Sequence, residues 1–225
     1  MNFYKFKFLR NPLTKNQQEK IRKTKFTIVG LGGTGGFILE NLLRLGAENI
    51  IVFDHDRFEL SNFNRQTLAT DEFLDIPKVH AAIARAKTIN KNINLKTFRK
   101  FDEDTDINTT DMLLDGTDNL ESKLLMARMA RDKKIPYVFC SAQSTRGMVT
   151  IFTTYKFEKA FQLAGKDIDN FSSCSSIMCP AASLAGTLAV SQAMNFLLKK
   201  PITKAPNAIF FDLYKKEIFW KAKLG

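Results

Sequence analysis

The chain has 225 residues, 44% of them hydrophobic, which is enough for one α/β domain with a full core. A formal net charge of +11 favours anionic partners such as a nucleotide, a nucleic acid or an acidic protein surface, but lysine and arginine are spread along the whole chain, which weakens the case for nucleic acid. No apolar run is long enough to span a membrane, no secretory signal opens the chain, and three cysteines argue against a disulfide framework, so we expect a cytoplasmic protein with no membrane association.

The first 25 residues are basic and partly amphipathic. A turn signal at Asn11-Pro12 precedes the pattern of a short helix over 17–23. We expect residues 1–25 to form an N-terminal arm that packs beside the main sheet or reaches a second subunit.

A glycine-rich turn follows the first predicted strand, residues 26–30, and opens a helix from about 34 to 45. The glycines, Gly30-x-Gly32-Gly33-x-Gly35, permit a tight turn and let backbone amides approach a phosphate at the helix N-terminus. By itself this pattern predicts a nucleotide site, and a dinucleotide is the default ligand.

A second buried strand, residues 49–54, ends in the carboxylate of Asp54. Asp54 follows Gly30 at about the distance at which such folds place the acid that binds a ribose hydroxyl. A helix cap or a turn is the other interpretation of an aspartate at a strand end, and the preceding glycine turn favours the ribose.

Strand and helix patterns then alternate to the end of the chain, without a repeat or a linker. We predict a helix over 77–90 with Pro77 at its first position, strands at 95–100 and 111–115, a helix over 119–133, strands at 135–140 and 148–154, loops at 102–110 and 155–180, a helix over 181–198, and a closing hairpin of 209–213 and 217–222. The fold class is therefore α/β in one domain, 1–225, with a mostly parallel sheet flanked by helices and an antiparallel C-terminal extension.

Side chains that suit phosphate follow the second strand: Asn62, Arg65, Gln66 and then Lys78. Asp118 stands at the end of strand 111–115, where open parallel sheets bind ligands and where a carboxylate can hold Mg²⁺ against phosphates. Each residue has an ordinary alternative, solvation for the cations and a helix cap for Asp118-Asn119. Together, in a chain with two histidines and no second α/β half, they favour nucleotidyl transfer over hydride transfer.

These motifs resemble the ThiF/MoeB/HesA family, which shares its adenylation domain with the ubiquitin-activating enzymes. The matching motifs are Gly30-x-Gly32-Gly33-x-Gly35, Asp54-x-Asp56, Ser61-Asn62-x-x-Arg65-Gln66, Pro77-Lys78 and Asp115-x-Thr117-Asp118-Asn119. The resemblance runs from about Gln18 to the C-terminus and implies a Rossmann-like fold. It specifies the superfamily far better than the substrate.

The resemblance implies that ATP adenylates a carboxylate, usually the C-terminal glycine of a small ubiquitin-like sulfur-carrier protein ending in Gly-Gly, and that pyrophosphate leaves. The implied ATP-binding residues are Gly30, Gly32, Gly33, Gly35, Asp54, Asp56, Asn62, Arg65, Gln66, Lys78, Asp118 and Asn119. The implied catalytic residues are Arg65, Lys78 and Asp118, with Mg²⁺ on Asp118. Members of the family are typically dimers in which an N-terminal arginine reaches the neighbouring ATP site. The resemblance therefore implies a homodimer here, with Arg10 as the candidate arginine.

The cysteines depart from the family pattern in two ways. Many members hold a structural zinc on two Cys-x-x-Cys pairs, and this chain has none, so we predict no zinc. Cys174 lies in the loop where members often carry a cysteine that takes up the activated acyl group or sulfur, but it stands closer to Pro180 than is usual. A catalytic Cys174 and a structural one both stay open, whereas Cys140, at the end of an apolar strand, is expected in the core.

Three other functions remain as alternatives. The basic charge suits an ATP-dependent dehydratase that adenylates a carboxylate on threonylcarbamoyladenosine in tRNA, although the compact closing hairpin favours a protein substrate. A non-catalytic subunit of a heterodimeric activating enzyme predicts a lost phosphate clamp, which Arg65, Lys78 and Asp118 argue against. A nicotinamide oxidoreductase predicts tight dinucleotide binding without ATP turnover.

Overall fold

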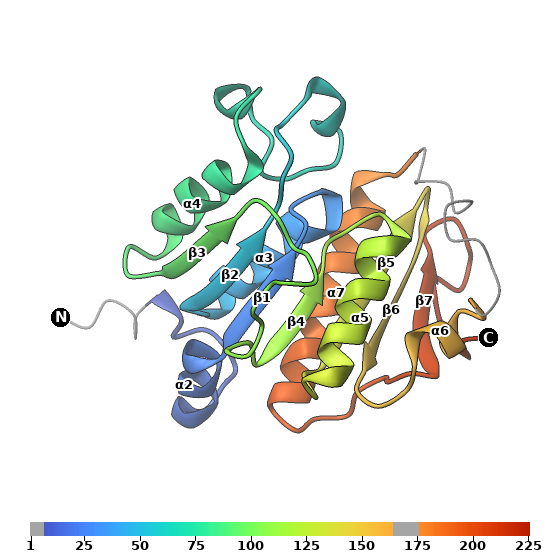
Figure 1. Cartoon of the computed structure of the whole chain (residues 1–225). Helices are drawn as coiled ribbons and strands as arrows, with labels where there is room; N and C mark the ends of the chain where they lie inside the picture. Colours follow the sequence, from blue (N-terminus) through green and yellow to red (C-terminus); the bar gives the residue numbers. More distant parts are fainter. Residues whose placement is uncertain (1–6, 164–175) are drawn as a thin grey trace.

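The computed structural model of the chain describes residues 7–163 and 176–225, which are arranged around one eight-stranded sheet (Figure 1). The strands lie in the order β3-β2-β1-β4-β5-β6-β7-β8. Their bounds are β1 Lys25–Val29, β2 Asn49–Phe53, β3 Asn94–Phe98, β4 Met112–Asp115, β5 Tyr137–Gln143, β6 Arg146–Phe152, β7 Asn207–Asp212 and β8 Phe219–Lys223. Strands β1 to β5 pair in parallel and β6 to β8 pair antiparallel, so the expected mostly parallel sheet with an antiparallel C-terminal extension is confirmed.

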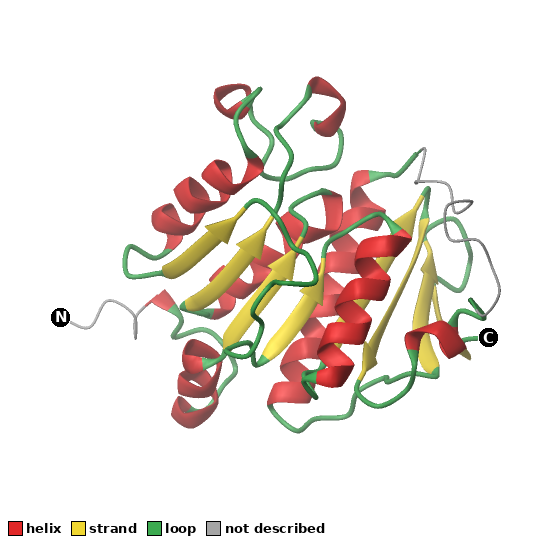
Figure 2. Cartoon of the chain, in the orientation of Figure 1, coloured by secondary structure: helices red, strands yellow, loops and turns green. Residues whose placement is uncertain are grey.

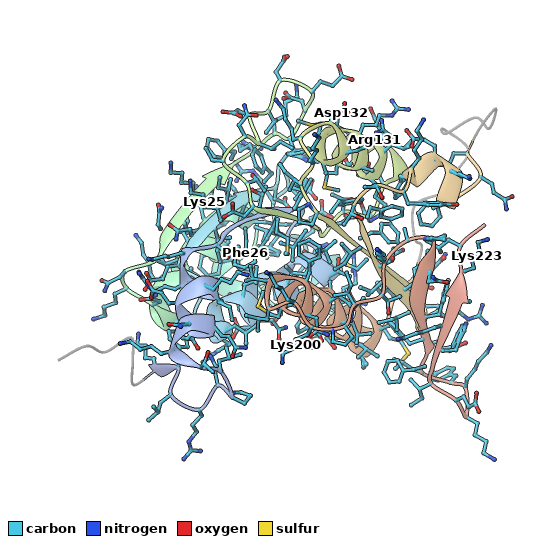
Figure 3. All side chains as sticks on the ribbon, turned by 90° about the horizontal axis from the view of Figure 1, so that it is seen from below. Lys25, Phe26, Arg131, Asp132, Lys200 and Lys223 are labelled. Carbon is cyan, nitrogen blue, oxygen red and sulfur yellow. The ribbon has the colours of Figure 1, made fainter. Side chains whose placement is uncertain are left out.

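Helices cover both faces of the sheet (Figure 2). They are α2 Lys15–Lys23, α3 Gly33–Leu45, α4 Lys78–Ile89, α5 Leu120–Asp132, α6 Phe157–Ala160 and α7 Cys179–Leu197, with 3₁₀ turns η1 Leu60–Asn62 and η2 Asp71–Phe73. The side chains of α3, α4 and α7 share one apolar core, and those of α5 and α6 share the other. Viewed from below, Arg131 near the end of α5 and Lys200 beyond α7 lie on opposite sides of the sheet (Figure 3). None of the described helices is both long enough and apolar enough to cross a membrane.

The strand order reverses between β1 and β4, because the chain adds β2 and β3 on one side of β1 and then returns to add β4 and β5 on the other. Open α/β sheets bind their ligands in the crevice at this switch point, beyond the carboxyl ends of the strands. The fold therefore fixes in advance which end of the sheet carries the site.

Helix α3 joins the glycine turn to the core. Its apolar stripe, including Ile38, Leu39 and Leu42, is fully buried, and Gly46 ends it in the left-handed conformation with a φ of 87°. Gly186 of α7 lies against its first turn, where a Cβ would stand 2.6 Å from the Thr34 carbonyl oxygen. The N-terminus of α3 is thus fixed between the sheet and α7.

The expected helix in the N-terminal arm is α2, and it packs on its own chain. Ile21 is fully buried, Arg22 pairs with Glu48 at 2.9 Å, and Lys20 donates to the Leu197 carbonyl at 2.5 Å. Packing beside the main sheet, the first of the two expectations for the arm, therefore describes its helix.

Several expected boundaries were wrong. Within the expected surface loop 155–180, residues 157–160 form α6, and Phe157 and Leu163 are buried because they complete the aromatic core under α5. Helix α7 begins at Cys179 rather than at 181, and Pro77 is the residue before α4 rather than its first residue. Cys140 is buried as expected, whereas Cys174 lies outside the described residues.

Candidate functional site

A cleft of about 1080 Å³ lies at the carboxyl ends of the parallel strands, over the switch point. Figure 1 shows the arrowheads of β1, β2 and β4 directed toward this edge of the sheet. The predicted site residues that line it are Gly30, Gly32, Gly33, Asp54, Asp56, Arg65, Gln66, Lys78, Asp118 and Asn119. Residues separated by almost 90 positions are thereby brought together in one cleft.

Close backbone contacts form the floor of the cleft. Gly30 has a φ of +88°, and a Cβ there would stand 2.6 Å from the Gly116 carbonyl oxygen. A Cβ on Gly35 would stand 1.9 Å from the Gly30 oxygen, so α3 approaches β1 as closely as two backbones allow. Gly32 differs, because a Cβ there would make only ordinary contacts, 3.9 Å from the Gly116 oxygen and 4.0 Å from Gln66 Nε2, so a methyl group fits at the N-terminus of α3. That N-terminus offers amides to an anion.

Asp54 is held at the cleft wall by two backbone amides. Its Oδ2 accepts from the Leu31 N–H at 2.6 Å and its Oδ1 from the Asp56 N–H at 2.9 Å. Burial raises the pKa of this carboxyl, while the charge of Lys78 and the two amides lower it in part. A carboxylate has about four acceptor sites, so Asp54 retains capacity for a ligand hydroxyl.

Lys78 begins α4 with its side chain against the protein. The residue is 4% exposed, and its Nζ lies 2.9 Å from Oδ2 of Asp56 and 5.9 Å from the ring centre of Phe58. Asp56 is half-exposed, so it is a weak competitor for the ammonium. Lys78 is thus a positioned cation that is almost entirely shielded from water.

Arg65 and Gln66 lie across the start of α3. The Arg65 guanidinium donates to the Ser61 carbonyl and to Asn64 Oδ1, both at 2.8 Å. Gln66 is 5% exposed, and its Oε1 is the single buried side-chain oxygen or nitrogen without a partner in the part of the chain that the structure describes. An unpaired buried carbonyl is costly unless a bound molecule or water pairs with it, so Gln66 fits a ligand-binding wall.

Three predicted residues do not line the cleft: Gly35, which lies against the Gly30 carbonyl beneath it, Asn62 and Arg10. The Asn62 side chain is buried, accepts from the Glu59 N–H at 3.2 Å and donates to Ser61 Oγ at 3.3 Å, and its carbonyl accepts from the amides of the next turn. Asn62 therefore shapes the segment that carries Arg65. Arg10 is exposed and is not among the residues that line the cleft of its own chain. Its contact with the cleft of a neighbouring subunit stays a prediction.

Asp118 is exposed at the opposite rim, on the turn between β4 and α5. The next residue, Asn119, caps α5 by accepting from the Ser122 N–H at 2.8 Å, so the helix-cap interpretation is correct for Asn119. Among the described residues no group of three or more His, Cys, Asp or Glu is placed to hold a metal ion. Mg²⁺ in nucleotide sites needs one or two carboxylates plus phosphate oxygens, so a lone exposed Asp118 fits it.

Sequence reasoning missed a buried polar cluster beneath Asp118. Lys123 Nζ donates to Asp115 Oδ2 at 2.9 Å, to the Thr117 carbonyl at 2.7 Å and to the Cys140 carbonyl at 3.3 Å. The Tyr137 hydroxyl donates to the same Asp115 Oδ2 at 2.7 Å. One signal was present in the sequence: Lys123 falls on the apolar stripe of α5, four positions before Ala127.

An aromatic wall borders the cleft on the β2 side. Phe53 and Phe101 line it with their ring centres 5.2 Å apart, edge to face, and Phe98 stacks on Phe53 at 5.2 Å. A flat apolar wall next to a ribose-type carboxylate is suited to a nucleobase.

The ThiF family model matches residues 6–224 of the chain. The chain is 33% identical over 195 residues to the molybdopterin-synthase adenylyltransferase of Haemophilus influenzae, covering 81% of this chain and 78% of the relative. It is 25% identical over 224 residues to the sulfur carrier protein ThiS adenylyltransferase of Bacillus subtilis, covering 92% of this chain and 63% of the relative.

Solved structures share the fold at low sequence identity. The crystal structure of Escherichia coli MccB with ATP is similar with a TM-score of 0.74 at 18% identity, and that of PaaA with a TM-score of 0.75 at 19% identity. The chain covers 66% of the length of each, just under two thirds, and 93% and 92% of this chain is matched. At this identity the likeness concerns the fold alone.

Proposed function

Because this chain belongs to the ThiF family, we propose that it uses ATP to adenylate the C-terminal glycine of a ubiquitin-like sulfur-carrier protein, releasing pyrophosphate. Curated relatives from three bacteria are named adenylyltransferases, and the chain is an adenylyltransferase. The identity of the acyl substrate is the part that we propose, on the basis of the relatives named for sulfur-carrier proteins.

One observation carries the proposal: the cleft combines a glycine turn, a ribose-type carboxylate, cations and a free carboxylate around one switch point. A carboxylate substrate and a triphosphate repel each other. Catalysis therefore consists mainly of holding both in place and neutralising charge, which Lys78 and Arg65 are suited to do.

Each residue then has a proposed task. Asp54 accepts from ribose hydroxyls, and the amides near Gly32 and Gly33 hold phosphate oxygens at the N-terminus of α3. Lys78 binds phosphates from the start of α4, and Arg65 binds them from the segment that lies across the start of α3. Asp118 would hold Mg²⁺, which supplies charge neutralisation on the phosphates when bound.

The aromatic wall supplies the site for the base. Phe101 projects from the segment after β3 and contacts Phe53, which directly precedes Asp54. We place the adenine against this pair, since the sugar and the base of one nucleotide are adjacent.

ATP–pyrophosphate exchange tests the proposal. Exchange that depends on a carrier protein ending in Gly-Gly, and that disappears when the last glycine is removed, is the expected result. Exchange stimulated only by threonylcarbamoyladenosine-modified tRNA supports the dehydratase instead. If neither substrate supports exchange in the purified chain, its role is that of a non-catalytic subunit.

We further propose that the active form is a homodimer in which Arg10 of one copy reaches the cleft of the other. Arg10 is exposed in the N-terminal arm and does not line the cleft of its own chain, so its guanidinium is available to enter the cleft of a second subunit.

A further inference from the structure

The turn that carries Asp118 rests on a buried ion pair. Asp115 is fully buried, the side chain of Lys123 is 9% exposed, and their charged atoms are 2.9 Å apart. The Lys123 ammonium also lies 5.1 Å from the ring centre of Phe139. The pair therefore sits in the core between β4, α5 and β5, one layer below the cleft floor.

This pair holds every polar group of the residue before Asp118. The Thr117 N–H and hydroxyl both donate to Asp115 Oδ1, at 2.9 and 2.7 Å. The Thr117 carbonyl accepts from Lys123 at 2.7 Å. On the other side the Asn119 cap fixes the chain to α5. The backbone of Asp118 is therefore fixed at both ends, while its carboxylate has no hydrogen bond within the described residues and faces the cleft rim.

Stability alone does not account for a buried pair of this kind. Taking two charges out of water costs about as much as their attraction returns, and apolar replacements are often neutral or stabilising. A buried ion pair that makes four or more hydrogen bonds does, however, hold the bonded segment of chain in one conformation. Here that segment is the backbone from which the Asp118 side chain extends.

We propose that Lys123 is a positioning residue: its ammonium, paired with Asp115, fixes the Thr117 carbonyl and thereby the placement of the Asp118 carboxylate toward a metal-bound nucleotide. The inference rests on the proposed nucleotide function. It assigns to Lys123 an effect on divalent-cation affinity that a purely structural lysine does not have.

The test compares Lys123→Met with Lys133→Met, which makes the same chemical change at the exposed C-terminal end of α5. Mn²⁺ affinity is measured by electron paramagnetic resonance in the presence of a non-hydrolysable ATP analogue, and folding is checked by thermal unfolding. We expect Lys123→Met to weaken Mn²⁺ binding by about tenfold or more, as loss of an outer-shell partner does. Lys133→Met should bind as the wild type does.

A double-mutant cycle separates positioning from general damage. In an Asp118→Asn background, Lys123→Met should change Mn²⁺ affinity by less than about twofold, since the two residues act through one carboxylate. Equal Mn²⁺ affinity in wild type and folded Lys123→Met, or additive losses in the cycle, overturns the proposal.

A second variant covers the case in which Lys123→Met does not fold, because it leaves Asp115 buried without its ion. Thr117→Val keeps the side-chain shape and removes only the hydroxyl bond to Asp115. It should weaken Mn²⁺ binding by about threefold, less than the full contribution of a hydrogen bond to a charged group, because the Thr117 N–H and carbonyl bonds remain. Unchanged binding in folded Thr117→Val then overturns the proposal. If wild-type protein binds no Mn²⁺–nucleotide at all, the proposed function fails first, and the two failures are thus distinct.

Discussion

At the scale of single residues, the cations of the cleft differ in how they are held. Lys78 pairs with the half-exposed Asp56, its charge also acts on the buried Asp54, and an aromatic ring centre lies at 5.9 Å. One nitrogen of the Arg65 guanidinium donates hydrogen bonds to two neighbouring oxygens, the Ser61 carbonyl and Asn64 Oδ1. Both retain donors for a phosphate, and Lys78, being nearly excluded from water, offers the stronger field.

Lys78→Ala should lower ATP–pyrophosphate exchange by about 100- to 1,000-fold, because a preorganised donor at the developing charge is removed. Stability should fall only modestly, because Asp56 reaches water and the buried Asp54, which also loses the charge of Lys78, keeps its two backbone amide donors. Lys87→Ala, at an exposed position of the same helix, is the matched control. Full exchange by folded Lys78→Ala contradicts the phosphate role.

Cys140 is expected to be chemically inert in the folded chain. Burial raises the pKa of its thiol from 9.0 to about 12, helped by the negative charge of Asp115. Iodoacetamide at pH 8.5 should therefore leave Cys140 unmodified in the native protein and modify it in urea. The half-buried Cys179 should react faster in the native protein. Peptide mass spectrometry measures the modification of both thiols. Native labelling of Cys140 at the rate of Cys179 contradicts this placement.

The same pKa shift has a consequence for stability at alkaline pH. Between pH 9.0 and about 12 the unfolded chain loses this thiol proton while the folded chain retains it. The contribution of Cys140 to the free energy of unfolding is therefore complete below pH 9.0 and declines as the pH rises through that window.

At the scale of elements, β1 and α3 show that glycines of one motif have separate tasks. Gly35 permits contact between helix and strand, since a Cβ there would meet the Gly30 oxygen at 1.9 Å. Gly32 lines the cleft, and a Cβ there would stand no closer than 3.9 Å to a neighbouring atom. The first is a packing requirement and the second a ligand requirement.

Gly35→Ala should therefore destabilise the fold by about 3 kcal/mol, typical of severe overpacking, and lower the melting temperature by roughly 10 °C. Gly32→Ala should melt like the wild type but bind ATP more weakly, because its methyl group enters the cleft. Differential scanning calorimetry and nucleotide titration measure the two effects. Equal melting temperatures for the two variants contradict the division of tasks.

The sequence predicts elements well where a period and a stop signal agree, as for α3 with Gly46, and poorly where burial depends on distant partners. Residues 157–160 lack a period, and they become a buried helix because Phe139 and Phe152 of other strands surround Phe157. The site follows the same rule. Residues in a recognisable motif, such as Asp54 and Lys78, line the cleft as expected.

Residues defined by tertiary contact were harder to predict. Asn62 belongs to the motif, yet its side chain accepts a hydrogen bond from the Glu59 N–H in its own turn instead of lining the cleft. Lys123 lies outside the motif, and its partners come from β4 and β5, which no local pattern reveals.

At the scale of the whole molecule, the proposed homodimer makes a complementation test possible. Lys78→Ala inactivates the cleft of the chain that carries it. By this proposal Arg10→Ala instead inactivates the cleft of the other chain in the dimer. Mixing the two inactive proteins should restore roughly a quarter of wild-type exchange by random reassortment of subunits into dimers. Sedimentation velocity checks the assembly, and a mixture no more active than its parts contradicts delivery of Arg10 from a partner.

The order of the strands also governs how the chain can mature as it leaves the ribosome. β1 emerges early, but one of its two edges stays open until β4 appears about 85 residues later, and the face of α3 under Gly186 stays uncovered until α7 is made. A nascent chain that already holds the glycine turn, Asp54 and Lys78 therefore displays an unpaired strand edge and an apolar helix face. We therefore expect the segment with most of the proposed nucleotide-binding residues to depend on the C-terminal half for protection from aggregation.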